Sequence, residues 1–151
     1  MHYMKNTSLV PKVFIDTNIL LDYLIPVRVN HETVLNLFSL ILSGEIEASF
    51  STQSMLDAVY VGNKHPGFIK NYRETLIALI NRTNASYIDT WDMNTALMDP
   101  DPGIEDSAQI SFAFNQCCDF IITNDKKMLS REVPKPMKVI TPEEFVNNCR
   151  A

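Results

Sequence analysis

Short apolar runs alternate with longer stretches of helical periodicity along this chain, and this alternation most constrains how it can fold. Residues 30–43 carry apolar side chains at i, i+3, i+4 and i+7, a spacing typical of one helix face. Strands that alternate with helices favour βαβ units and a mainly parallel sheet. A three-layer α/β/α single domain is therefore predicted. The predicted strands span residues 12–15, 45–51, 86–88, 119–123 and 138–140, and the predicted helices span about 30–43, 52–61, 68–82, 92–98, 104–115 and 142–148.

Two of the apolar runs end in the same way, with a carboxylate and small polar side chains. Val13-Phe14-Ile15 is followed by Asp16, and Phe120-Ile121-Ile122 is followed two residues later by Asp125. In open α/β sheets, ligands bind just beyond the carboxyl ends of the strands. Two acids at two such ends would face one crevice, which suggests a divalent-metal site. Taken alone, each acid could equally be a turn residue or a helix cap.

Two further acids lie on predicted helices between these strand ends. Asp106 is near the start of the helix at 104–115, where a negative charge is favourable for the helix dipole alone. Asp57 lies outside the apolar side of the helix at 52–61, where a solvated acid is the simpler interpretation. Together with Asp16 and Asp125 they form a set of hard oxygen ligands that suits Mg²⁺ or Mn²⁺.

Composition narrows the classes of function. The 13 Lys and Arg residues against 18 Asp and Glu residues give a net charge of −5, which argues against charge-driven binding of nucleic acid. Cys117, Cys118 and Cys149 have no CxxC spacing and are expected to be reduced, small buried hydrophobes in the cytoplasm. The three scattered histidines make a zinc site improbable. No run reaches a membrane-spanning length, and residues 1–5 lack the apolar core of a secretory signal.

The order of these motifs resembles the PIN domain, a small metal-dependent ribonuclease fold. Residues 13–18 (VFIDTN) resemble the opening strand and first acid of the family, and 50–57 (FSTQSMLD) its second strand and helix. Residues 104–110 (IEDSAQI) resemble the helix start with the third acid, and 121–129 (IITNDKKML) the last strand and acid. The resemblance implies one domain over residues 1–151, with its core from about 12 to 145. It also implies an endoribonuclease that uses Mg²⁺ or Mn²⁺.

The resemblance implies roles for individual residues. Asp16, Asp106 and Asp125 would be the principal metal ligands, and Asp57 would contribute to the site or orient the attacking water. Asp57 departs from the family, because glutamate is commoner there and is longer by one methylene. The resemblance further implies that Asn18 and Thr123 orient the ligands. Lys126, Lys127 and Arg131 lie just beyond Asp125 and could hold phosphates or could be ordinary solvated cations.

Three classes of function stay open at this point. The first is the endoribonuclease, since short members of the family are often toxins with a protein antitoxin, and a homodimer is plausible from the family. The second is a nucleic-acid or protein binding module of the same fold with little catalysis, which fits the net acidity and Asp57. The third is a phosphatase-like enzyme with Asp16 as nucleophile, which is disfavoured because Asn18 stands where such enzymes usually carry a second acid.

Overall fold

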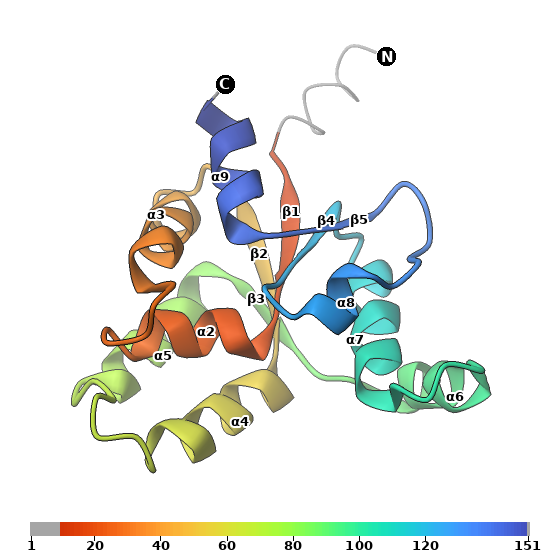
Figure 1. Cartoon of the computed structure of the whole chain (residues 1–151), viewed down its shortest axis with the longest axis horizontal. Coiled ribbons are helices and arrows are strands. Elements are labelled where there is room, and N and C mark those ends of the chain that lie inside the picture. Colours follow the sequence, from red (N-terminus) through yellow and green to blue (C-terminus); the bar gives the residue numbers. More distant parts are fainter. Residues whose placement is uncertain (1–9, 151) are drawn as a thin grey trace.

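The computed structural model describes residues 10–150 and has one parallel sheet of five strands with helices on both faces (Figure 1). The strand order is β3-β2-β1-β4-β5, so the first strand in sequence is central. This architecture confirms the predicted α/β/α fold. Residues 1–5, for which no secretory signal was predicted, lie outside the described residues. The strands are β1 (Lys12–Ile15), β2 (Glu47–Ser51), β3 (Asn84–Ser86), β4 (Phe120–Ile122) and β5 (Lys138–Ile140).

The alternation of side chains along β1 divides the core into two halves. The helices are α2 (Thr17–Leu24), α3 (His31–Leu42), α4 (Thr52–Gly62), α5 (Tyr72–Arg82), α6 (Thr90–Met98), α7 (Ile104–Asn115), α8 (Lys126–Leu129) and α9 (Pro142–Arg150). Val13 and Ile15 belong to the larger cluster, whose helical residues come from α2, α3, α4, α5 and α9. Phe14 points to the other cluster and meets Phe112 of α7 edge to face, at 5.7 Å between ring centroids.

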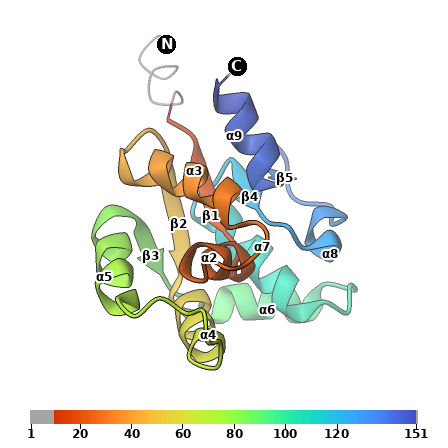
Figure 2. The ribbon, with the colours of Figure 1, turned by 60° about the vertical axis from the view of Figure 1, so that its left-hand side comes forward.

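Helix α2 is the main element that the sequence patterns did not predict. Its sequence, TNILLDYL, has eight residues, fewer than the roughly 11–18 over which helical periodicity is recognised, and its acid Asp22 is buried. In Figure 2 it crosses in front of β1, between α3 and α4. Its one acid, Asp22, is buried and paired with Arg28, whose Nε lies 2.6 Å from Asp22 Oδ1. A helix packed between two others was therefore missed because it is short and follows β1 directly.

Several other boundaries differ from the predictions: β2 begins at Glu47 rather than at residue 45, and α6 begins at Thr90 rather than at residue 92. Helix α5 begins at Tyr72 rather than at residue 68, because the preceding turns are fixed to α2 by the Ile69 N–H, which donates to the carbonyl of Leu24 (3.2 Å). Strand β3 lies two residues earlier than predicted, since the parallel register pairs Ala85 with Phe50 of β2. The short helix α8 was not predicted. It packs Met128 completely into the second core cluster.

The cysteines agree with the expectation only in part. Within residues 10–150 no disulfide joins them, and Cys118 is buried. Burial raises the pKa of the Cys118 thiol to about 11, so this group stays protonated at neutral pH. Cys117 and Cys149 are exposed, which corrects the prediction that all three are buried hydrophobes. Cys117 lies in the turn after α7 with a positive φ of 60°.

Because every described pairing is parallel, the carboxyl ends of all five strands lie along one edge of the sheet. Asp16 follows β1, Ser51 ends β2, and Thr123 follows β4 at this edge. The sheet therefore gathers polar side chains from its three central strands at one place.

No helix in residues 10–150 is both long and apolar enough to cross a bilayer.

Candidate functional site

A pocket of about 300 Å³ opens at the carboxyl edge of the sheet, and all four predicted acids line it. Asp16 comes from the end of β1, Asp57 from α4, Asp106 from α7 and Asp125 from the turn before α8. Asn18, in the first turn of α2, also lines the pocket. The remaining lining residues are Thr17, Leu21, Tyr60, Val61, Glu105 and Gln109. Residues separated by more than 100 positions in the sequence thus surround one acidic cavity, which we call the acidic pocket.

Asp16 is the most deeply placed of the four acids, with 7% of its surface exposed. Its Oδ1 accepts a hydrogen bond from the backbone N–H of Thr17 (2.7 Å), so it caps α2. Its Oδ2 accepts from Thr123 Oγ1 (2.7 Å). Burial raises the pKa of Asp16 above its usual value and the two hydrogen bonds oppose this, while the charges of Asp106 and Asp125 raise it further. Asp16 is therefore both a helix cap and a wall of the acidic pocket.

Thr123 is completely buried and connects the two strand ends. Its hydroxyl donates to Asp16 Oδ2 and accepts from the backbone N–H of Asp125 (3.0 Å). Because one hydroxyl is hydrogen-bonded to both the Asp16 side chain and the Asp125 backbone, the relative position of the two acids depends on Thr123. This contact is consistent with the predicted orienting role of Thr123, which stays a prediction.

Replacing Thr123 with valine keeps the shape of the side chain but removes the hydroxyl, so it should loosen the two acids. We expect a loss of about 1–2 kcal/mol in the free energy of unfolding at neutral pH, because Asp16 Oδ2 and the Asp125 N–H both lose a buried partner. Urea unfolding measures this loss. Thr123→Ser restores the hydroxyl and should recover most of it, whereas equal losses in both variants would show that the methyl group is what matters.

Asp106 and Asp125 lie at the starts of two neighbouring helices. Asp106 is in the first turn of α7, and Asp125 caps α8 by accepting from the Lys127 N–H (3.1 Å). Burial raises the pKa of Asp106 above its usual value, and the charge of Asp125 adds to this rise. The positive charges of Arg131 and Lys127 oppose it. The mutual effects among Asp16, Asp106 and Asp125 mark them as one electrostatic group.

Asp57 stands somewhat apart from these three acids. It is half-buried on α4, and its Oδ1 accepts from Gln53 Nε2 (2.9 Å). It is not among the charges that raise the pKa of Asp16 or Asp106. The start of α4 is nonetheless tied to the start of α2, because Ser54 Oγ accepts from Thr17 Oγ1 (2.9 Å). Asp57 thus faces the acidic pocket from a helix whose position relative to Asp16 is fixed.

The three predicted phosphate-binding cations are not equivalent. Lys126 and Lys127 are exposed on α8 and do not line the acidic pocket. Arg131 has a side chain only 11% exposed, with Nε 3.4 Å from Asp101 Oδ2 and Nη2 3.5 Å from Asp99 Oδ2. Its Nη2 also donates to Ser107 Oγ of α7 (2.6 Å). Arg131 therefore fastens the loop before α7 to the first turn of that helix, and it is not the solvated cation that was the alternative; phosphate binding by these three residues stays a prediction.

Replacing Arg131 with glutamine should destabilise the protein and loosen the start of α7. Two partly exposed acids of the 99–103 loop would lose their cationic partner and Ser107 would lose a hydrogen bond, so we expect a loss of about 1–2 kcal/mol in the free energy of unfolding. Urea unfolding of Arg131→Gln tests this. Lys70→Gln is the matched control, because Lys70 is exposed and its loss should cost less than about 0.5 kcal/mol. Equal stability of the two variants would contradict the fastening role.

Some residues of the acidic pocket were not predicted as site residues. Gln109 is only 5% exposed, and it follows Asp106 by three positions on the same face of α7. Tyr60 has the same relation to Asp57 on α4. Helical spacing from the predicted acids is therefore the signal that could have found both. Thr17 and Glu105 adjoin predicted acids in sequence and carry no separate signal.

The donor set fits a hydrated divalent cation rather than a closed protein cage. Among residues 10–150, no three Asp, Glu, His or Cys side chains are gathered closely enough to enclose an ion unaided. Five carboxylates, the four predicted acids and Glu105, nevertheless line one pocket, and three of them repel one another. Mg²⁺ typically keeps several waters and takes one or two carboxylates from the protein. Asp16, Asp106 and Asp125 could hold such an ion in part through water.

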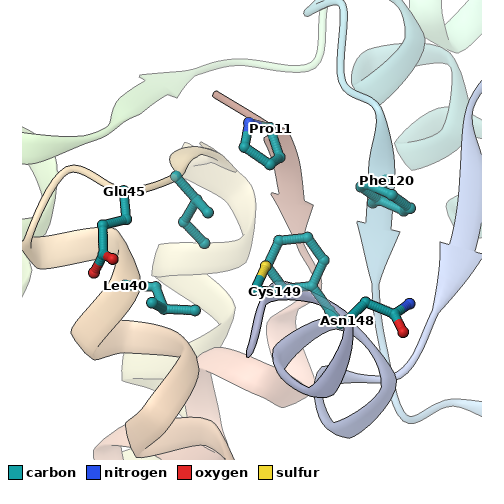
Figure 3. A pocket seen from close by; sticks show the side chains of 8 residues that line it. Pro11, Leu40, Glu45, Phe120, Asn148 and Cys149 are labelled. Carbon is teal, nitrogen blue, oxygen red and sulfur yellow. The ribbon is translucent and has the colours of Figure 1, made fainter. Parts of the chain in front are cut away.

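A second cavity, of about 410 Å³, lies at the opposite edge of the sheet, between α3 and α9 (Figure 3). It is lined by Pro11 before β1, Phe120 at the start of β4, and Leu40 and Phe145 from the two helices. Glu45 is its one acid. Because it lies at the amino ends of the strands, it does not share in the chemistry of the acidic pocket.

The comparison with known families agrees with this arrangement. The family model described as PIN domain matches residues 12–127. The chain belongs to the PIN-domain family. No curated protein matches this PIN-domain sequence.

Two solved structures resemble this PIN domain in fold. The first is VapC20 of Mycobacterium tuberculosis, described as a Sarcin-Ricin loop cleaving toxin. It is 11% identical, with a TM-score of 0.65, and the match covers 83% of this chain and 98% of that one. The second is VapBC2 of Rickettsia felis, described as bound to a DNA fragment from their promoter. It is 15% identical, with a TM-score of 0.60, and the match covers 86% of this chain and 98% of that one. At these identities the likeness concerns the fold.

Proposed function

We propose that this PIN-domain protein is an endoribonuclease that depends on Mg²⁺ or Mn²⁺ and acts as the toxin of a toxin–antitoxin pair. The observation that carries the proposal is the acidic pocket, in which Asp16, Asp57, Asp106 and Asp125 meet at the carboxyl edge of the sheet. Membership of the PIN-domain family and the fold shared with VapC20 support a nuclease. A binding module alone would not need three mutually repelling acids in one cavity.

The proposed reaction is attack of water on a phosphodiester. When bound, a divalent cation would hold a phosphate oxygen, lower the pKa of the attacking water and stabilise the leaving oxygen. Asp16, Asp106 and Asp125 would supply the negative charge that holds the cation. Thr123, which is hydrogen-bonded to the side chain of Asp16 and to the backbone of Asp125, would keep these two acids at a fixed separation. Asp57, from the neighbouring helix, would accept a hydrogen bond from the water and orient it. The new P–O bond forms as the bond to the leaving ribose oxygen breaks. The attacking water releases one proton to solvent, and the leaving oxygen takes up one proton from solvent.

The proposed partners follow from the same assignment. RNA is the substrate, and a small protein antitoxin is the inhibitor. The likeness to VapBC2, a complex described with promoter DNA, supports an antitoxin of that kind. A homodimer in the cytoplasm completes the proposal, and the unpaired cysteines fit a reducing compartment.

The proposal is tested with purified protein and labelled single-stranded RNA. The wild type should cleave the RNA in Mn²⁺ or Mg²⁺ and stop in excess EDTA. The Asp16→Asn/Asp106→Asn double variant should be inactive in all conditions. Undiminished metal-dependent cleavage by that variant would overturn the assignment. A wild type that cleaves nothing and has no affinity for Mn²⁺ at millimolar concentration would favour the binding module.

A further inference from the structure

A hollow of about 530 Å³ adjoins the acidic pocket, and the two share Asp57 and Glu105 as lining residues. It lies between the start of α4 and the start of α7, and we call it the side pocket. Its other lining residues are Thr52, Gln53, Tyr87, Ile88, Met93, Ile104 and Ala108. Its volume is in the range of small-molecule sites, and it is continuous with the place where the proposed chemistry occurs. A group attached to a reacting phosphate could therefore enter it.

The walls of the side pocket are of two chemical kinds. One kind is apolar and aromatic: Tyr87 is 69% exposed in the segment after β3, and Met93, Ile104 and Ala108 come from α6 and α7. The other kind can form hydrogen bonds and comes from Thr52 and Gln53 of α4. Gln53 Nε2 donates to Asp57 Oδ1, so its amide oxygen is left to accept from a ligand. Flat apolar surface beside a few polar groups suits a planar heterocycle.

The charge of the side pocket excludes some ligands. Apart from Tyr87, the ionisable residues that line it are two acids, Asp57 and Glu105. No lysine, arginine or histidine lines it. A phosphate or an acidic peptide would therefore be repelled, whereas an uncharged base with exocyclic amines would not. Single-stranded RNA is recognised mainly through unpaired bases that stack on aromatic side chains and form hydrogen bonds with their edges.

We propose that the side pocket binds one unpaired nucleobase of the RNA, next to the phosphate held at the acidic pocket. The proposal rests on the proposed nuclease function and deepens it. Tyr87 stacks on the base, and the side chains of Gln53 and Thr52 form hydrogen bonds with the edge of the base. The protein would then select single-stranded over paired RNA and favour certain bases beside the cut, although its net charge gives it little attraction to nucleic acid as such.

The test compares Tyr87→Leu with Tyr87→Phe on a fluorescein-labelled single-stranded RNA that the wild type cleaves. Base stacking on an aromatic ring supports an expected rise of about tenfold in KM for Tyr87→Leu, with kcat changed less than about threefold. Tyr87→Phe keeps the ring and should stay close to the wild type. Trp91→Leu is the matched control, because Trp91 is 68% exposed on the adjacent α6 but does not line the side pocket.

An abasic nucleotide placed in turn on each side of the cut locates the base. At the correct position it should raise KM for the wild type about as much as Tyr87→Leu does, and the two changes together should add little more. Additive effects, or equal effects of Tyr87→Leu and Trp91→Leu, would overturn the side pocket as a base site. So would a Tyr87→Leu variant that binds RNA normally but shifts its sedimentation, since that result would mark a protein–protein surface.

Fluorescence anisotropy of the same RNA, measured in EDTA, separates this proposal from the nuclease assignment. If the wild type cleaves no RNA, the proposed function fails. Weaker binding of intact RNA by Tyr87→Leu, with no difference between the variants on abasic RNA, would still support the side pocket. Equal binding of intact RNA by wild type and Tyr87→Leu would overturn it.

Discussion

The Asp16→Asn variant is expected to cleave RNA about 10²- to 10³-fold more slowly than the wild type, while it stays folded. Asparagine keeps the side-chain shape: its one oxygen can still accept from the backbone N–H of Thr17, and its amide N–H can donate to the hydroxyl oxygen of Thr123, which reverses the second hydrogen bond. It removes a charge at the most buried acid of the pocket, and losing one preorganised electrostatic group from an active site typically costs this much in kcat. Single-turnover cleavage of labelled RNA, with circular dichroism to confirm folding, measures the effect.

The four acids should differ in a way that follows from their positions. Asp106→Asn and Asp125→Asn should also be strongly impaired, because these residues share the electrostatic group of Asp16. Asp57→Asn should lose less, about tenfold, since Asp57 is hydrogen-bonded to Gln53 and stands apart from that group. Glu132→Gln is the matched control, because it removes one exposed carboxylate just after Arg131 and should leave the rate unchanged. Equal losses of cleavage rate in all four Asp→Asn variants and in Glu132→Gln would contradict the assignment of the active site.

Mn²⁺ should raise the melting temperature of the wild type. A ligand that binds only the folded state at about tenfold above its Kd stabilises it by about 1.4 kcal/mol, or roughly 3–5 °C for a domain of this size. The repulsion among Asp16, Asp106 and Asp125 is relieved when a cation binds, so the shift should disappear in Asp106→Asn. Differential scanning fluorimetry in Mn²⁺ and in EDTA measures it, and a shift that survives in Asp106→Asn would place the ion elsewhere.

The stability of the metal-free protein should depend on pH through the same acids. The pKa values of Asp16 and Asp106 are raised in the folded state, so the folded state binds more protons than the unfolded chain above the ordinary aspartate pKa of 3.8. Their contribution to stability therefore falls as pH rises from about 3.8 through the raised values, and they cost stability at neutral pH. Without metal, Asp106→Asn should melt above the wild type at pH 7, and this advantage should shrink towards pH 4. An advantage that grows towards acid pH would reverse the sign and contradict the raised pKa.

The sequence predicted the sheet and the four acids because both depend on local, strongly patterned segments. The runs at β1 and β4 are short, apolar and followed at once by polar residues, so their strands and their ends could be located. A parallel sheet then brings those ends to one edge without further information. Asp16 and Asp125 were ambiguous between cap and site, and in the structure each caps a helix and also lines the acidic pocket.

What the sequence did not predict depends on contacts between distant segments. Helix α2 has only eight residues and follows β1 directly, so too little of the chain was available to show a helical period. The sequence suggested that Arg131 is a free cation beside Asp125. In the structure its guanidinium forms ion pairs with Asp99 and Asp101, about 30 residues earlier. The side pocket is lined by Gln53, Tyr87 and Met93, which come from three segments. The spacing of residues within any one of these segments could not predict it. Tertiary packing decides each of these features.

The central claim is that a divalent cation binds among the carboxylates at the ends of β1 and β4. Anomalous diffraction from crystals grown with Mn²⁺ tests it most directly. The account predicts one strong Mn²⁺ peak in the acidic pocket, at about 2.2 Å or one water molecule away from Asp16 and from Asp106 or Asp125. A crystal saturated with Mn²⁺ whose acidic pocket shows no peak, or whose ion lies at another site, would contradict it.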